Sequence, residues 1–229
     1  MKSICIIPAR GGSKRIPRKN IKLFRGTPLI GWVIEIAKQS DCFDEIFIST
    51  DDLEIANYSK ALGAKIPFLR PKKLSDDYTS TMDVMKYMVK QIIKSDKDIK
   101  YICCMYATAP LIIKSDLKES LGIIKKEKSD QILFGVTTFD YPIQRAVVLD
   151  SKNNSSFLKK EFLYSRSQDL QETFHDAGQF YWGNVNAWLN TKSILDGGKA
   201  FKIPRWRVQD IDVPEDWVRA ENIHKQLNG

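Results

Sequence analysis

The chain has 229 residues, 43% of them hydrophobic, which is the length and composition of one globular domain with a full core. Its 36 lysines and arginines exceed its 28 aspartates and glutamates by a formal charge of +8, and residues 1–34 hold eight basic residues and no acidic one. Because the whole excess lies in one segment, the charge favours a small, highly charged anion and argues against a nucleic acid, which usually meets basic residues from several elements.

The cysteines and the apolar segments indicate the compartment. None of the four cysteines is in a metal-ligand spacing, and they are expected to be buried thiols in a reducing environment: Cys5, Cys42, Cys103 and Cys104. We expect no signal peptide, because the first apolar stretch is interrupted at Pro8 and Arg10, and no apolar run is long enough to span a bilayer. These features predict a cytoplasmic protein with no membrane partner.

Short apolar strands alternate with helical patterns through the first 139 residues. Strands are expected at residues 3–9, 45–49, 101–107 and 131–139, and helices at 28–39, 51–63, 81–94 and 115–128. Asp51, followed by Glu54, is expected to cap the second of these helices, which gives it no role in a site. Such a succession implies a mainly parallel sheet with helices on both faces, and these folds bind ligands at the carboxyl ends of their strands.

The alternation fails between residues 140 and 182. This stretch is largely polar, lacks a clear period and includes a turn at 153–156. We expect it to be an insertion within a single domain of residues 1–229, which covers the site or makes a subunit contact. After it, the pattern predicts strands at 180–182 and 207–213, a helix near 188–195 and a last helix from Pro214.

The loop after the first strand has the sequence IPARGGSKRIPRKNIK, residues 7–22. A glycine pair lets backbone N–H groups turn toward a ligand, and lysines and arginines neutralise an anion. The spacing matches neither the GxxxxGK[ST] loop of ATPases nor the GxGxxG of dinucleotide folds. A solvated basic loop is the alternative explanation. From its residues alone, the loop predicts polyphosphate binding at the end of the first strand.

The same loop resembles the signature of the CMP-sugar synthetases, the cytidylyltransferases that activate sialic-acid-type sugars. The resemblance continues through STDD (49–52), FLRPKKLSDD (68–77), ATAP (107–110) and DIDVPEDW (210–217). It implies a three-layer αβα, Rossmann-like nucleotidyltransferase fold with a mainly parallel central sheet and an inserted sugar-binding or dimerisation segment. It also implies Mg²⁺-dependent transfer of CMP from CTP to the anomeric hydroxyl of a nonulosonic acid, with release of pyrophosphate, by a homodimer.

The segment FHDAGQFYWG (174–183) and the adjoining YATAP most resemble the pseudaminic acid cytidylyltransferases. N-acylneuraminate enzymes usually carry an NGAxY-type segment there and a glutamine at the position of Tyr106. Pseudaminic acid is therefore the expected acceptor, and N-acetylneuraminate, legionaminate and 3-deoxy-octulosonate are alternatives. Alternatives of another class are a nucleotide-binding protein without turnover and, last, an RNA-binding protein.

The resemblance implies a set of nucleotide-binding residues: Ala9, Arg10, Gly11, Gly12, Ser13, Lys14, Lys19, Asn20, Arg70, Thr79, Ser80 and Thr81. Arg10 and Lys14 belong to the catalytic set on the triphosphate, Asn20 is placed near the ribose, and Arg70 with residues 79–81 is placed at the cytosine. Structural roles compete with these, because Asn20 could cap a turn and Ser80 or Thr81 could cap the next helix.

Asp210 and Asp212 are the candidate metal ligands and complete the catalytic set. Two residues apart in an expected strand, they would leave the same face, and two carboxylates suit Mg²⁺. The alternative is that Asp212 favours the N-terminus of the helix from Pro214.

The sugar is expected to meet a further group: Tyr106, Arg166, His175, Asp176, Gln179, Phe180 and Tyr181. Arg166 is the candidate clamp for the sugar carboxylate, with Arg145 as a weaker one, because a guanidinium matches a carboxylate geometrically. His175 could be a general base or a hydrogen-bonded structural histidine. His224 is expected at the surface.

Overall fold

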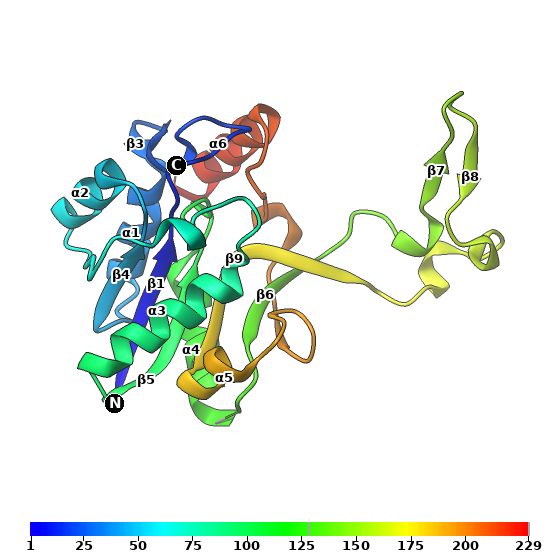
Figure 1. The fold of residues 1–229 in the computed structure, drawn as a ribbon. Coiled ribbons are helices and arrows are strands. Elements are labelled where there is room, and N and C mark those ends of the chain that lie inside the picture. The colour runs from blue at the N-terminus through cyan, green and yellow to red at the C-terminus, as the bar shows by residue number, and fades with distance from the viewer. Residues whose placement is uncertain (128, 229) are drawn as a thin grey trace.

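The fold is built on a six-stranded sheet of order β10-β6-β9-β5-β1-β4 in the computed structural model, which describes every residue except 128 and 229 (Figure 1). The strands are β1 (Lys2–Pro8), β4 (Glu45–Ser49), β5 (Ile99–Met105), β6 (Leu133–Thr138), β9 (Phe174–Asn184) and β10 (Lys199–Lys202). β9 runs antiparallel to β5 and β6, and the other neighbours in this sheet are parallel. The mainly parallel sheet predicted from the sequence is confirmed.

Helices cover both faces of the sheet: α1 (Leu29–Gln39), α2 (Leu53–Ala61), α3 (Thr81–Ser95), α4 (Lys114–Glu127), α5 (Val185–Asn190) and α6 (Pro214–Asn228). Successive residues of β5 face opposite layers, so Cys103 packs with α1 and α4 whereas Cys104 packs with α3 and α5. The three-layer αβα arrangement is therefore confirmed. All four cysteines are buried and free, as expected.

Short elements fill the connections. β2 (Leu23–Phe24) pairs with β3 (Thr27–Pro28), and β7 (Val147–Leu149) pairs with β8 (Ser155–Phe157). Turns of 3-10 helix lie at Lys19–Ile21, Lys72–Leu74, Ile143–Arg145, Lys160–Phe162, Ser167–Asp169 and Arg205–Arg207. Within the described residues, every helix is too short or too polar to traverse a bilayer.

Residues 139–173 form an arm that leaves the body of the molecule after β6 and returns to it in β9 (Figure 1). The β7–β8 hairpin lies on this arm. The insertion is therefore present, but the prediction that it extends to residue 182 is wrong, because Phe174–Asn184 is a central strand. The beginning of β9 pairs with β6 alone and has polar residues that border a cavity, so the hydrophobic alternation is lost there.

Three other expectations are wrong. Residues 207–213 do not form a strand, and the strand next to β6 is β10, formed by a shorter segment earlier in the chain. The helix expected near 188–195 begins and ends earlier, at Val185–Asn190, where Asn184 caps it by accepting a hydrogen bond from the Ala187 N–H. His224 is buried against Phe24 and Trp32, and its desolvation there lowers its pKa to about 4.

Candidate active site

The basic loop encloses a cavity of about 290 Å³ at the carboxyl ends of β1 and β5. The loop begins where β1 ends, so the apolar strand fixes one side of the cavity and the start of α3 closes the other. Most of the residues predicted for the nucleotide line this cavity together with Tyr106: Arg10, Ser13, Lys14, Lys19, Asn20, Arg70, Thr79 and Thr81. The structure thus brings into one place residues that are up to 96 positions apart in the chain.

Acidic residues of the turn before α3 pair with the basic loop. Arg10 Nη1 lies 2.6 Å from Asp77 Oδ1 and donates to the Asp76 carbonyl oxygen at 2.9 Å. Lys14 Nζ pairs with the other oxygen of Asp77. Hydrogen bonds from Lys14 and Arg10 lower the pKa of Asp77. The Asp77 carboxylate is therefore held as an anion by the same two groups that are predicted to bind phosphate.

Asn20 and Lys19 fix the shape of the loop. Asn20 is buried, and its Nδ2 donates to the carbonyl oxygen of Arg10 at 2.9 Å, which is a structural role across the loop and not the turn cap that the sequence allowed. Lys19 Nζ donates to the carbonyl oxygen of Ile211 and lies 3.3 Å from Asp212 Oδ1. Lys19 therefore joins the basic loop to the segment that carries the candidate metal ligands.

Four residues predicted for the nucleotide do not line the cavity: Ala9, Gly11, Gly12 and Ser80. Ser80 caps α3 by accepting a hydrogen bond from the Asp83 N–H at 3.1 Å, so the capping alternative is confirmed. Gly11 packs against α2, where a Cβ would lie 2.6 Å from Asp52 Oδ2. The close approach that requires glycine there is to the protein itself.

The prediction that Asp51 caps α2 is wrong. Asp52 is the cap, because its Oδ1 accepts a hydrogen bond from the Ile55 N–H at 3.0 Å. Asp51 Oδ1 instead accepts from the Gly11 N–H at 3.1 Å and lies 3.7 Å from Nη2 of Arg70. Only one of two adjacent aspartates can occupy the position before the first helical residue. The sequence shows both aspartates, so it also offered Asp52 as the capping residue.

Asp210 and Asp212 lie on an irregular segment, so the shared strand face predicted for them is wrong. Asp216 holds the segment from α6, because its Oδ2 accepts from the N–H groups of Asp212 at 3.0 Å and Val213 at 2.9 Å. At the other end, Arg207 Nη1 lies 2.8 Å from Asp116 Oδ2 in a buried ion pair. The segment that carries Asp210 and Asp212 is therefore held by hydrogen bonds to Asp216 and by a buried ion pair, and not by strand pairing.

The two candidate metal ligands have different surroundings. Burial and then the charge of Asp212 raise the pKa of Asp210. Asp212 pairs with Arg15 at 2.8 Å and with Lys19 at 3.3 Å. No group of three or more Asp, Glu, His or Cys side chains arranged to hold a metal occurs among the described residues, so an ion here would rest on these two carboxylates and on a ligand.

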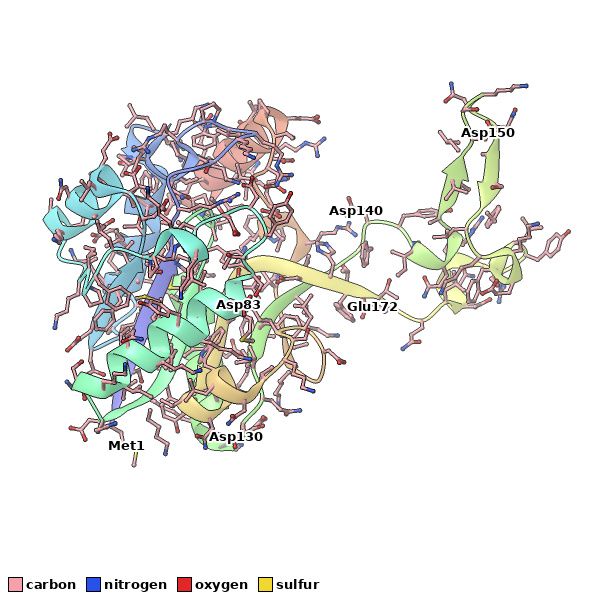
Figure 2. The ribbon with its side chains drawn as sticks, viewed as in Figure 1. Met1, Asp83, Asp130, Asp140, Asp150 and Glu172 are labelled. Atoms are coloured by element: carbon pink, nitrogen blue, oxygen red, sulfur yellow. The ribbon has the colours of Figure 1, made fainter. Side chains whose placement is uncertain are left out.

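A second cavity, of about 390 Å³, borders Asp210 at the base of the arm. Figure 2 shows Asp140, which lines it, where the arm leaves the body. Its remaining lining comes from β6, β9 and the segment after β10: Thr137, Thr138, His175, Asp176, Ala177, Arg205, Val208 and Gln209. Of the residues predicted for the sugar, His175 and Asp176 lie here.

Three residues of this cavity were not predicted from the sequence: Thr137, Arg205 and Gln209. The available signal was the position of Thr137 near the carboxyl end of a predicted strand, where ligands bind in such folds. Arg205 has no comparable signal, because it approaches through a non-repetitive segment. Within one chain, Arg205 is the guanidinium at this cavity, and its Nε lies 2.5 Å from Asp140 Oδ1.

The other residues predicted for the sugar have different positions. Phe180 is fully buried in the core and packs on Phe201, so its prediction as a pocket residue is wrong. Tyr181 lies on the face of β9 opposite to Phe180 and is fully buried, and its hydroxyl donates a hydrogen bond to the Asp176 carboxylate. Gln179 is buried, and its Nε2 donates to the carbonyl oxygen of Arg207 at 3.0 Å.

The two candidate clamps lie on the arm. Arg166 Nε lies 2.7 Å from its neighbour Asp169, and Arg145 Nη1 donates to Ser167 Oγ at 3.2 Å. Neither arginine lines either cavity of its own chain. Arg166 therefore lies away from both cavities of its own chain, and its role as the clamp for the sugar carboxylate stays a prediction.

Comparisons with known proteins agree with this geometry. A family model described as cytidylyltransferase matches residues 4–195. The chain is 45% identical to a pseudaminic acid cytidylyltransferase of Campylobacter jejuni over 98% of this chain and 97% of the relative. It is 32% identical to N-acylneuraminate cytidylyltransferase A of Danio rerio over 94% of this chain and 49% of that one.

A solved structure of a CMP:2-keto-3-deoxy-manno-octonic acid synthetase complexed with CTP has the same fold. Its TM-score is 0.72 with 18% identity, covering 99% of this chain and 100% of the other. The predicted nucleotidyltransferase fold is thereby confirmed. The chain belongs to the cytidylyltransferase family and is a nucleotidyltransferase enzyme of the CMP-sugar synthetase type.

Proposed function

We propose that the enzyme transfers CMP from CTP to the anomeric hydroxyl of pseudaminic acid, giving CMP-pseudaminic acid and pyrophosphate. The observation that carries the choice of sugar is the 45% identity, over nearly the whole of both chains, with a pseudaminic acid cytidylyltransferase. The geometry supports the reaction, because a basic cavity lies beside a second cavity bordered by carboxylates.

The triphosphate binds in the basic cavity. Arg10 and Lys14 exchange the Asp77 carboxylate for phosphate oxygens, which carry more charge and more hydrogen-bond acceptors. Lys19 adds positive charge on the side of Asp212. Arg70 and Thr81 line the same cavity and are proposed for the cytidine end. These groups hold the nucleotide so that the α-phosphate faces the acceptor.

Asp210 and Asp212 fit a Mg²⁺ ion. Burial and then the charge of Asp212 raise the pKa of Asp210, so Asp210 and Asp212 would hold a divalent cation whose charge offsets their repulsion. When bound, Mg²⁺ supplies positive charge that lowers the pKa of the acceptor hydroxyl and neutralises the phosphate. Without added charge, a sugar carboxylate about 4 Å from a phosphate oxygen costs about 4 kcal/mol at an effective dielectric of about 20.

The acceptor binds in the second cavity, which Asp210 lines. Attack on the α-phosphate is direct and in line, with positioning and electrostatics supplying the rate. His175 lines this cavity and its Nδ1 lies 2.8 Å from the Asp176 carbonyl oxygen. This contact with a backbone carbonyl orients the imidazole ring. Direct attack needs no covalent intermediate.

The arm supports a homodimer. Its exposed apolar side chains include Tyr141, Val148, Leu149, Leu158 and Tyr164. A concentration of large apolar residues on a projecting segment marks a protein contact surface. We propose that the arm packs on a second copy of the chain. In such a dimer, Arg145 and Arg166 would lie near the acceptor cavity of the other copy.

Release of pyrophosphate from CTP, Mg²⁺ and each of a panel of acceptors tests the function. The panel contains pseudaminic acid, N-acetylneuraminate, legionaminate and 3-deoxy-octulosonate. We expect the highest kcat/KM with pseudaminic acid. A higher value with another member would overturn the choice of sugar, and no release with any of them would overturn the function.

A further inference from the structure

The hydroxyl of Tyr181 is directed at a carboxylate of the second cavity. Tyr181 is fully buried in β9, and its Oη donates to Asp176 Oδ2 at 2.6 Å. Asp176 is half-buried and lines the cavity next to Asp210. A short bond from a buried hydroxyl to a carboxylate is among the stronger hydrogen bonds, so it fixes the direction of the Asp176 side chain.

Tyr181 is itself fixed from the side of the nucleotide cavity. The rings of Tyr106 and Tyr181 have centroids 5.1 Å apart, and the Tyr106 hydroxyl lies 3.0 Å from Thr81 Oγ1. Burial raises the pKa of Tyr106 to about 12 and that of Tyr181 further, so both hydroxyls stay protonated. Thr81 and Tyr106 line the nucleotide cavity, so Tyr181 lies between the two cavities.

A break in the register of β9 completes the support of Asp176. In the pairing of β6 with β9, Phe134 pairs with Tyr181, and the next pair is Val136 with Asp176. Residues 177–180 of β9 are therefore left without partners on β6 and form a bulge. Within the bulge, Gly178 has a φ of +63° and its N–H donates to Asp176 Oδ1 at 2.9 Å. Both oxygens of Asp176 are thus anchored.

Each carboxylate oxygen can accept a second hydrogen bond, which leaves Asp176 with acceptor capacity directed into the cavity. The bulge also lies against the candidate metal ligand, because a Cβ on Gly178 would be 3.9 Å from Asp210 Cγ. The Asp176 carboxylate repels the sugar carboxylate and the phosphates. The substrate group that suits Asp176 is therefore an uncharged donor, the N–H of an acylamino group or a hydroxyl.

We propose that Tyr181 is a positioning residue that fixes Asp176 to accept a hydrogen bond from an N–H or O–H group of the acceptor sugar. This inference rests on the proposed function and adds to it the residue pair that selects a neutral donor group on the acceptor. Removing the hydroxyl in Tyr181→Phe frees the carboxylate to rotate, so recognition of the acceptor weakens while the nucleotide site stays intact.

Steady-state pyrophosphate release, with each substrate varied at saturation of the other, tests the proposal. Tyr181→Phe is expected to raise the KM for the acceptor about tenfold and to leave the KM for CTP within about twofold of the wild type. Asp176→Ala is expected to raise the acceptor KM at least as much. The double variant should be no worse than Asp176→Ala, because the hydroxyl acts only through that carboxylate.

Tyr101→Phe is the matched control, since it removes the hydroxyl of another buried tyrosine, on the neighbouring β5, that lines neither cavity, and both KM values should remain unchanged. Additive effects of Tyr181→Phe and Asp176→Ala, or equal changes in both KM values, would overturn the proposal. Asp176→Glu keeps the charge but displaces the carboxylate from Tyr181, and a wild-type acceptor KM in that variant would overturn it even if Tyr181→Phe failed to fold.

The wild-type enzyme separates this proposal from the function on which it rests. Turnover with a nonulosonic acid, combined with unchanged acceptor KM values in the variants, would overturn only the role of Tyr181. An absence of turnover with every acceptor would overturn the proposed function instead.

Discussion

Asp77 bridges Arg10 and Lys14, binding the first at 2.6 Å and pairing with the second through its other oxygen. Both basic residues belong to the loop that follows β1, whereas Asp77 comes from the turn before α3. The carboxylate thus occupies the basic groups that the triphosphate needs. Nucleotide binding has to break these two ion pairs, so Asp77 competes with the phosphates for Arg10 and Lys14.

Asp77→Asn is therefore expected to tighten CTP binding. All three side chains are at least a third exposed, so each ion pair contributes little, and the expected gain in affinity is about threefold. Titration calorimetry with CTP measures it. Asp96→Asn, which removes a half-buried pair with Lys2 at the opposite end of the sheet, is the control and should leave affinity unchanged. Weaker binding by Asp77→Asn would mean that Asp77 arranges the basic side chains productively.

Asp212→Asn is expected to lower kcat by about 100-fold or more while the affinity for CTP stays within about threefold of the wild type. The variant removes a hard anionic ligand but leaves Arg10, Lys14 and Lys19 in place. Glu215→Gln, an exposed carboxylate nearby on α6, should keep full turnover. Normal turnover by Asp212→Asn would remove that residue from the proposed metal site.

The Arg207–Asp116 pair is expected to support both stability and turnover. Asp116→Asn leaves a guanidinium buried without its anion, which should cost about 3–5 kcal/mol in urea unfolding. The segment bearing Asp210 should then lose its anchor, and kcat should fall. The double variant Asp116→Leu/Arg207→Met is expected to regain stability, because a buried pair can be replaced by apolar groups. A loss under 1 kcal/mol in the single variant would contradict the anchoring role.

Acid should weaken the pairing of Asp52 with Arg18. The hydrogen bond from Arg18 lowers the pKa of Asp52 below its ordinary value of 3.8. Its stabilising contribution is therefore complete above that value and is lost as the pH falls through the folded-state pKa. Asp52→Asn keeps the helix cap but removes the charge, so it should be about 1 kcal/mol less stable at pH 7 and equal to the wild type in strong acid. A pH-independent difference in Tm would contradict this explanation.

Leu149→Glu is expected to convert the proposed homodimer into monomers. The leucine is on β7 of the arm and is 62% exposed, and burying a charge there in a subunit contact is unfavourable. Light scattering after gel filtration measures the mass. Leu53→Glu changes a leucine that is 65% exposed on α2 and serves as the control. An unchanged mass for Leu149→Glu would show that this face of the arm makes no subunit contact.

The sequence determined the layers of the fold and the position of the basic loop. Strand and helix periods are local, so β1, β4, α1 and α3 were predicted within a residue or two. The loop follows β1 directly, and a loop at the carboxyl end of a parallel strand lies at the ligand edge of the sheet. Its glycines, lysines and arginines therefore predicted a polyphosphate cavity before any long-range contact was known.

Only the tertiary structure decided which acids and which tyrosines border the cavities. Asp76 and Asp77 meet the loop because α3 packs beside β1. Asp176 lines the same cavity as Asp210, next to the bulge of β9. Asp210 and Asp212 owe their position to Asp216 and to the buried ion pair between Arg207 and Asp116, which are 91 residues apart in the sequence. Contacts of this kind have no period in the chain, because they arise from packing between distant segments.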